Sequence, residues 1–297
     1  MRVALKVDVD TYRGTRDGLP RLRRLFSDLG IRASFFLTLG PDHTGRRIFR
    51  ALRPAFLRKV RRTSVVSNYG VRTLLYGVLL PGPRIGRRCR EELRALARDG
   101  HDVGLHVYDH SLWQDHARFR GEPWTRRQFE RGVRAFRDVW DRDPVAHAAA
   151  GWQINEAVLA LEEARGFRYA SDCRGPGGPF YPSWNGRVFR CPQVPTTLPT
   201  LDEVLGRDGV DAGNFPAYFE RLARDTPGDH VLTLHAELEG GRYLQGFERL
   251  LRLWLEQGVV FETLEDLVAR HRSDELPVRP LVWASIPGRA GALATVV

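Results

Sequence analysis

The chain has 297 residues, 42% of them hydrophobic, and carries a formal net charge of +10. This length suits one large globular domain or two small ones, and no apolar run is long enough to predict a transmembrane helix. The positive charge comes almost wholly from arginine, because Lys6 and Lys59 are the only lysines. Such a bias is typical of a GC-rich genome, but it also favours an anionic partner, either a phosphate-bearing ligand or an acidic membrane surface. No recognised motif predicts nucleic-acid binding.

Three cysteines lie far apart in the chain and form no Cys-x2-Cys pair: Cys89, Cys173 and Cys191. An odd number without paired spacing predicts reduced thiols in the cytosol and not a disulfide framework. The first predicted strand begins at residue 3, so we expect no signal peptide before it.

The first predicted strand, residues 3–10, is apolar and β-branched until it ends in two carboxylates. Side chains alternate along a strand, so Asp8 and Asp10 share one face. Burying two like charges is unfavourable unless a cation lies between them, and a metal ion would supply that cation. The alternatives are an exposed loop start or an Asp-x-Asp nucleotide-sugar site, although no glycine-rich phosphate loop accompanies the motif.

Residues 19–29 have the apolar spacing of a helix that ends at Gly30, and residues 32–39 read as a second strand. This strand–helix–strand order predicts a parallel sheet or barrel.

Residues 46–90 interrupt that order, and residues 46–62 contain eight arginines or lysines among 17 residues. One interpretation is a solvated basic face over an ordinary apolar stripe. The other is a membrane-facing surface, in which basic heads bind lipid phosphates and apolar side chains reach acyl chains. The residues expected to do so are Phe56, Leu57, Arg58, Lys59, Arg61 and Arg62.

A helix is predicted over residues 85–98, and a third strand over 102–107 leads into His106-x3-His110. Two imidazoles at this spacing, with Asp10 at a neighbouring strand end, predict a facial metal site with positions open for water and substrate. The residue types suit one divalent ion and do not distinguish Zn, Mn, Co and Ni.

The rest of the chain continues the alternation. Strands are expected at 145–150, 167–171, 230–235 and 259–261, and helices at 125–140 (with Thr125 as N-cap), 155–165, 214–224, 244–257 and 264–270. We therefore predict one domain over residues 1–271, an irregular and partly open (β/α)7 barrel. The tail, residues 272–297, has few packing signals from Pro277 onward. In parallel α/β folds, chemistry gathers at the C-terminal ends of strands.

Three more polar residues lie at such strand ends. His235 closes an apolar strand and is a candidate general acid, although a strand histidine is often structural. Asp172 could orient and charge that imidazole, and Arg174 could pair with the free carboxylate of Asp8.

Together these residues resemble the polysaccharide deacetylase (NodB-homology) family of metal-dependent carbohydrate amidases. The resemblance implies that Asp8 is the catalytic base and that Asp10, His106 and His110 hold the metal ion. It also implies that His235, in Leu-Thr-Leu-His, is the catalytic acid supported by Asp172. Two departures stand out: Val9 separates the usual adjacent aspartates, and Ala-Ala-Ala-Gly-Trp at 148–152 lacks the third-motif arginine, which Arg174 could replace.

Over residues 3–270, the stretches VDVDTYRGTRDG, GLHVYDH, AAAGW, YASDCRG, VPTTLPTLDEV and LHAELEG are similar to one bacterial branch of this family. That branch removes formate from 4-deoxy-4-formamido-L-arabinose carried by undecaprenyl phosphate. The resemblance implies a cytoplasmic protein, peripheral on the inner membrane, that serves aminoarabinose modification of lipid A and polymyxin resistance. An N-deacetylase of another lipid-linked or soluble amino sugar and a polyprenyl-phosphate-binding protein with a relic site remain alternatives. The oligomeric state is not predicted.

Overall fold

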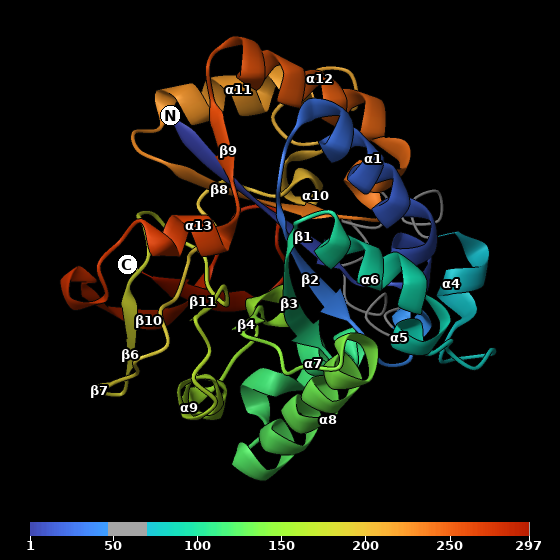
Figure 1. Ribbon diagram of the computed structural model, residues 1–297, viewed down its shortest axis with the longest axis vertical. Helices are drawn as coiled ribbons and strands as arrows, with labels where there is room; N and C mark the ends of the chain where they lie inside the picture. The colour runs from blue at the N-terminus through green and yellow to red at the C-terminus, as the bar shows by residue number, and fades with distance from the viewer. Residues whose placement is uncertain (47–69, 297) are drawn as a thin grey trace.

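The structure is a computed structural model that describes residues 1–46 and 70–296. Its main sheet has seven strands, which pair in parallel in the order β5-β4-β3-β2-β1-β8, with β9 also pairing with β1 (Figure 1). The predicted fold class, an irregular and partly open α/β barrel, is confirmed. The strands are β1 (Arg2–Val9), β2 (Ser34–Thr38), β3 (Asp102–Val107), β4 (Ala146–His147), β5 (Tyr169–Ala170), β8 (His230–His235) and β9 (Val260–Glu262).

Strand β1 is central in this sheet and separates two apolar clusters. Alternate residues face the helices and join the larger cluster: Val3, Leu5, Val7 and Val9. Ala4 faces the other way and packs with Phe36 in the smaller cluster. Because side chains alternate, Lys6 and Asp8 follow Ala4 on this inner face. Because the side chains of Lys6 and Asp8 point to the inner face, the candidate site lies on that face of the sheet.

The helices lie around the outside of the sheet (Figure 1). They are α1 (Leu19–Leu29), α4 (Val71–Leu75), α5 (Ile85–Arg88), α6 (Arg90–Arg98), α7 (His110–His116), α8 (Glu122–Trp140), α9 (Glu156–Ala164), α10 (Leu201–Val204), α11 (Phe215–Asp225), α12 (Leu244–Glu256) and α13 (Leu264–Ala269). Helix α1 has the predicted bounds, and Gly30 ends it in a left-handed conformation with φ of 66°.

Two helix predictions differ from the structure. Residues 85–98 form two helices, because Cys89 has a non-helical conformation between α5 and α6. Thr125 is not an N-cap, because α8 begins earlier, with Gly121 as its N-cap and a proline in its first turn. The Thr125 hydroxyl donates instead to the carbonyl of Gly121.

The C-terminal residues form two strands that pair with the rest of the chain. Strands β10 (Val278–Ser285) and β11 (Ala292–Val296) form an antiparallel hairpin, and β10 pairs in parallel with β6 (Tyr181–Trp184). With β7 (Arg187–Val188) they make a four-stranded sheet in the order β11-β10-β6-β7. The sequence shows few packing signals in this tail, because the parallel partner of β10 lies about a hundred residues earlier in the chain.

In the described part of the chain, no helix is both long and apolar enough to cross a membrane. The predicted lipid-facing residues lie outside the described residues: Phe56, Leu57, Arg58, Lys59, Arg61 and Arg62.

Candidate active site

The predicted base and acid come from neighbouring strands. Strands β1 and β8 pair in parallel, and Asp8 is directly opposite His235 in their register. Residues paired in this way put their side chains on the same face, and adjacent strands are about 4.8 Å apart. The inner face of the half-barrel therefore carries a buried carboxylate and an imidazole side by side.

His106 reaches the same edge of the sheet through an irregularity in β3. The register between β2 and β3 shifts, so that Leu37 pairs with Leu105 whereas Thr38 pairs with Val107. His106 is thus the extra residue of a β-bulge, a device that re-aims side chains next to active sites. Gly104, two residues earlier, permits the close packing of Phe36, since a Cβ there would lie 2.5 Å from its ring.

His110 is placed by the start of helix α7. Asp109 is the N-cap and accepts a hydrogen bond from the backbone N–H of Leu112 at 3.0 Å. Its other oxygen lies 2.6 Å from Nδ1 of His43. An anchored N-cap fixes the first helical turn, and with it the direction of the His110 imidazole.

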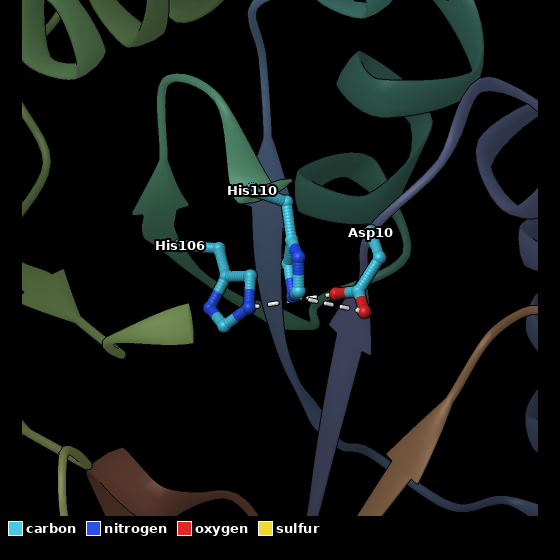
Figure 2. A group of neighbouring side chains, drawn as sticks. All are labelled: Asp10, His106 and His110. Carbon is cyan, nitrogen blue, oxygen red and sulfur yellow. Dashed lines mark ion pairs between the residues drawn. The ribbon is translucent and has the colours of Figure 1, made fainter. Parts of the chain in front are cut away.

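The two imidazoles converge on Asp10 (Figure 2). Nε2 of His106 lies 3.4 Å from Oδ1 of Asp10, and Nε2 of His110 lies 3.0 Å from Oδ2. All three residues are buried, and within the described ranges neither Oδ1 of Asp10 nor either ring nitrogen of His106 has a hydrogen-bond partner. Two ligands each about 2.1 Å from a tetrahedral zinc ion lie about 3.4 Å apart. The unpartnered atoms and their spacing fit a divalent metal ion.

The charge of Asp10 is compatible with this assignment. Burial raises the pKa of Asp10, but the interactions with His110 and His106 outweigh that effect, and the pKa is well below its ordinary value. Glu237 fixes the backbone at this point, because its Oε1 accepts hydrogen bonds from the N–H groups of Asp10 and Thr11 and from the Thr11 hydroxyl.

Two curated relatives identify the family. The chain is 38% identical over 293 residues to the probable 4-deoxy-4-formamido-L-arabinose-phosphoundecaprenol deformylase ArnD of Shewanella sediminis, an alignment that covers 99% of this chain and 94% of the relative. It is 32% identical over 282 residues to the protein of the same name from Wigglesworthia glossinidia brevipalpis, covering 95% and 97%. The chain belongs to this deformylase family. The resemblance drawn from the motifs is confirmed.

Solved polysaccharide deacetylases share the fold of this member of the deformylase family. A putative polysaccharide deacetylase from Mycobacterium smegmatis superposes with a TM-score of 0.64 at 19% identity, covering 96% of this chain and 94% of that one. A probable polysaccharide deacetylase from Pseudomonas aeruginosa PAO1 gives 0.62 at 16% identity, covering 92% and 91%. At such identities the likeness concerns the fold alone. No protein-family model matches the chain.

The cation beside Asp8 is a residue that the sequence analysis did not select. Lys6 is fully buried, and its Nζ lies 3.5 Å from Oδ2 of Asp8 and donates to the carbonyl of Ser171 at 3.1 Å. Nζ also lies 5.3 Å from the centre of the Trp152 ring. A buried carboxylate without a nearby cation is strongly unfavourable, and Lys6 supplies the compensating charge.

The predicted pair of Arg174 and Asp8 is absent from the described structure. Arg174 instead binds Glu203, with Nη1 at 2.7 Å from Oε1, and its guanidinium stacks on Trp152 at 4.8 Å. Its Nη2 donates to the carbonyl of Leu198. These contacts engage the guanidinium of Arg174 with Glu203, Leu198 and Trp152 in place of Asp8.

The predicted contact between Asp172 and His235 is also absent over the described ranges. Strand β5 and strand β8 lie at opposite ends of the main strand order, whereas β5 pairs directly with β4. Asp172 accordingly lies beside His147 of β4, with Oδ1 3.2 Å from Nδ1. Nδ1 of His235 is buried, and the described residues provide it with no hydrogen-bond partner.

His147 forms a second buried group with Glu162 and Asp172. Nδ1 of His147 lies 2.6 Å from Oε1 of Glu162, and the side-chain amide of Gln193 donates to both carboxylates, at 3.1 and 3.2 Å. Burial raises the pKa of Asp172, but the charge of His147 and a hydrogen bond to it reverse the shift, to about 2. Burial and the charge of Asp172 raise the pKa of Glu162.

Sequence reasoning selected Asp172 but missed Lys6, His147, Glu162, Glu237 and Glu239. Glu239 accepts a hydrogen bond from the backbone N–H of His235, and burial raises the pKa of both Glu237 and Glu239 to about 8. One signal was present: Lys6 is a charged residue inside an apolar strand, two positions before Asp8, which predicts a buried partner.

Proposed function

We propose that this chain is a metal-dependent hydrolase that removes formate from 4-deoxy-4-formamido-L-arabinose linked to undecaprenyl phosphate. The main support is near full-length similarity to curated deformylases, combined with Asp8, Asp10, His106, His110 and His235 at one edge of the sheet. The amine product would serve aminoarabinose modification of lipid A, and through it resistance to polymyxin.

Asp10, His106 and His110 would hold the metal ion. When bound, a divalent metal ion polarises the formyl carbonyl and lowers the pKa of a bound water. The residues present do not select among Zn, Mn, Co and Ni.

Asp8 is the proposed base. Its Oδ1 is buried without a hydrogen-bond partner in the described structure, while Lys6 contacts Oδ2. Oδ1 is therefore available to accept the proton of the attacking water as the water oxygen bonds to the formyl carbon.

His235 is the proposed acid on the neighbouring strand. It donates a proton to the sugar nitrogen as the C–N bond breaks, so that formate and the free amine leave. The Glu239 carboxyl group accepts a hydrogen bond from the backbone N–H of His235 at 2.9 Å and so holds the end of this strand.

The two alternatives make different predictions. An N-deacetylase must admit one more methyl group, and a small pocket discriminates by only about 1–3 kcal/mol per methylene. The naming of both curated relatives as deformylases favours formyl. A binding protein with a relic site would not need unpartnered ligand atoms in Asp10 and His106.

The decisive experiment is mass spectrometry of synthetic formamido-arabinose phosphoprenol after incubation with the purified protein. We expect loss of formate that EDTA abolishes and that an added divalent metal restores. Cleavage of only the acetamido analogue would mean that the protein is a deacetylase and not a deformylase. No reaction with either compound under any metal would favour the binding protein.

We also propose that the protein lies peripherally on the anionic cytoplasmic face of the inner membrane. Exposed apolar side chains gather at residues 71–80, with Leu79 76% exposed and Leu80 37% exposed. Exposed arginines flank them: Arg72, Arg84, Arg87 and Arg88. Apolar tips surrounded by basic residues suit an anionic lipid surface.

Co-sedimentation with phosphatidylglycerol vesicles tests this placement. Leu79→Ser/Leu80→Ser should lower binding several-fold, and added salt should weaken the wild-type binding. Phe119→Ser is the matched control, because Phe119 is 77% exposed but lies on another part of the chain. Equal binding by all three proteins would contradict the proposal.

A further inference from the structure

The turn of the C-terminal hairpin presses against helix α10. Gly288 has φ of +83°, and a Cβ on it would lie 2.4 Å from the backbone oxygen of Glu203. Only glycine fits both the left-handed conformation and this close approach. The turn follows Pro287, and the N–H of Arg289 donates back to the carbonyl of Ile286. This turn fixes the backbone of Arg289, and with it the direction in which the Arg289 side chain leaves the backbone.

Arg289 is held there by two contacts. Its Nε lies 2.7 Å from Oε1 of Glu203, and its guanidinium lies over the Trp152 ring, 4.5 Å from the centre. The side chain is 12% exposed. Among described residues, these contacts leave both Nη groups of Arg289 without a hydrogen-bond partner. A guanidinium fixed in this way has its forked donors available for an anionic ligand.

Trp152 connects this arginine to the proposed catalytic residues. The ring contacts both Arg289 and Lys6, and Lys6 in turn contacts Asp8. The charges of Arg289 and Asp10 also interact. Trp152 itself has a positive φ of 54°, and its buried indole N–H has no partner in the described ranges. Backbone outliers and unpartnered buried donors of this kind are concentrated at ligand-binding sites.

The donors of Arg289, and not an excess of positive charge, favour an anion. Arg174 and Arg289 both bind the carboxylate of Glu203, and the charge of Asp202 also acts on both arginines. These four groups balance in charge, so an anionic ligand would be recognised by the open Nη donors of Arg289.

We propose that Arg289 binds the phosphodiester of the sugar-phosphate substrate. This rests on the proposed deformylase function and identifies the residue that recognises the charged end of that substrate. The formamido group is on C4 of the pyranose and the phosphate is on C1, so the two groups lie across one sugar ring. Trp152 contacts both Arg289 and Lys6, so Arg289 is separated from Asp8 by these two side chains.

Steady-state kinetics on two compounds test the assignment: the formamido-arabinose phosphodiester of a short prenol, and the uncharged methyl glycoside of the same sugar. Arg289→Gln should raise KM for the phosphodiester about 10- to 100-fold, the worth of a hydrogen-bonded charge pair. It should leave kcat/KM for the methyl glycoside within about twofold of wild type, because that compound has no phosphate to bind. Arg289→Lys should give an intermediate KM, since the charge remains without the fork.

Arg279→Gln is the matched control from the same hairpin. Arg279 stacks on Phe180 and donates to the carbonyl of Pro176, so its loss should leave KM for both compounds unchanged. Equal losses on both compounds in Arg289→Gln, or no loss on either, would overturn the role of Arg289 while the deformylase function stands. Failure of the wild-type protein to cleave either compound would overturn the function itself and this assignment with it.

Discussion

Among the described residues, two buried groups combine histidine with carboxylates, yet they differ in how their polar atoms are satisfied. In the group of Asp10, His106 and His110, the facing atoms lie 3.0 and 3.4 Å apart, and several buried nitrogen and oxygen atoms have no partner in the described structure. This is the arrangement expected where a metal ion supplies the missing interactions.

The group of His147, Glu162 and Asp172 has the same residue types, but hydrogen bonds join Nδ1 of His147 and the two carboxylates, and in the described structure only Nε2 of His147 has no partner. Its facing atoms lie 2.6 and 3.2 Å apart, and the amide of Gln193 donates into the space between the two carboxylates. A metal ion there would have to displace that amide. The difference teaches that a metal site is recognised by unsatisfied lone pairs and not by ligand-type residues alone.

Substitution of one carboxylate in each group gives the largest expected contrast. Asp10→Asn should remove the bound metal and lower kcat/KM for deformylation at least about 10³-fold, because the metal ion stabilises the transition state by several kcal/mol. Glu162→Gln should keep full metal content and turnover within about twofold of wild type. Metal content is measured by plasma mass spectrometry and activity by formate release. Loss of metal from Glu162→Gln would break the distinction between the two groups.

Lys6 sharpens the comparison, because it is a buried cation whose partner, Asp8, is the proposed catalytic base. Lys6→Met should lower kcat about 10²-fold, because Asp8 would be left buried without its cation and poorly positioned. Lys6→Arg should recover most of the lost turnover. Both variants should keep the metal, since Lys6 contacts none of its three ligands.

Wild-type turnover in Lys6→Met would contradict this role. Loss of activity in Lys6→Met with no recovery in Lys6→Arg, together with a lowered melting temperature, would instead assign Lys6 to packing alone. The kcat of the two variants is measured beside their thermal unfolding.

The convergence of Asp10, His106 and His110 could be predicted because local rules place these residues. Alternation puts Asp8 and Asp10 on one face, and strand ends put His106 and His110 at the same edge of the sheet. The fold class followed from the same alternation of strands with helices. These inferences need only a few neighbouring residues at a time.

The partners of Asp172 and Arg174 could not be predicted in this way. Which carboxylate meets which cation depends on strand order and on contacts between distant segments, such as that between Arg174 and Glu203. The same holds for the C-terminal hairpin, since β10 pairs with β6 far along the chain. Short strands have weak sequence signals, and their pairing is set by tertiary packing.

Substitutions in the group of His147, Glu162 and Asp172 should change activity least but should clearly lower stability. Burial lowers the pKa of His147, but the charge of Asp172 and hydrogen bonds to Asp172 and Glu162 raise it to about 9. The ordinary pKa of histidine in an unfolded chain is about 6.5. The protonated ring therefore contributes its full stabilisation below about pH 6.5, and this contribution is lost as the pH rises through 9.

His147→Asn removes that contribution. In urea unfolding at about pH 6, the variant should be less stable than wild type by about 3 kcal/mol, and the difference should shrink at about pH 9.5. The difference should shrink because the wild-type protein loses stability between these two pH values. Folded His147 releases its proton over this range, whereas the variant has no such group. A difference that stayed constant between the two pH values would mean that His147 is neutral in the folded protein.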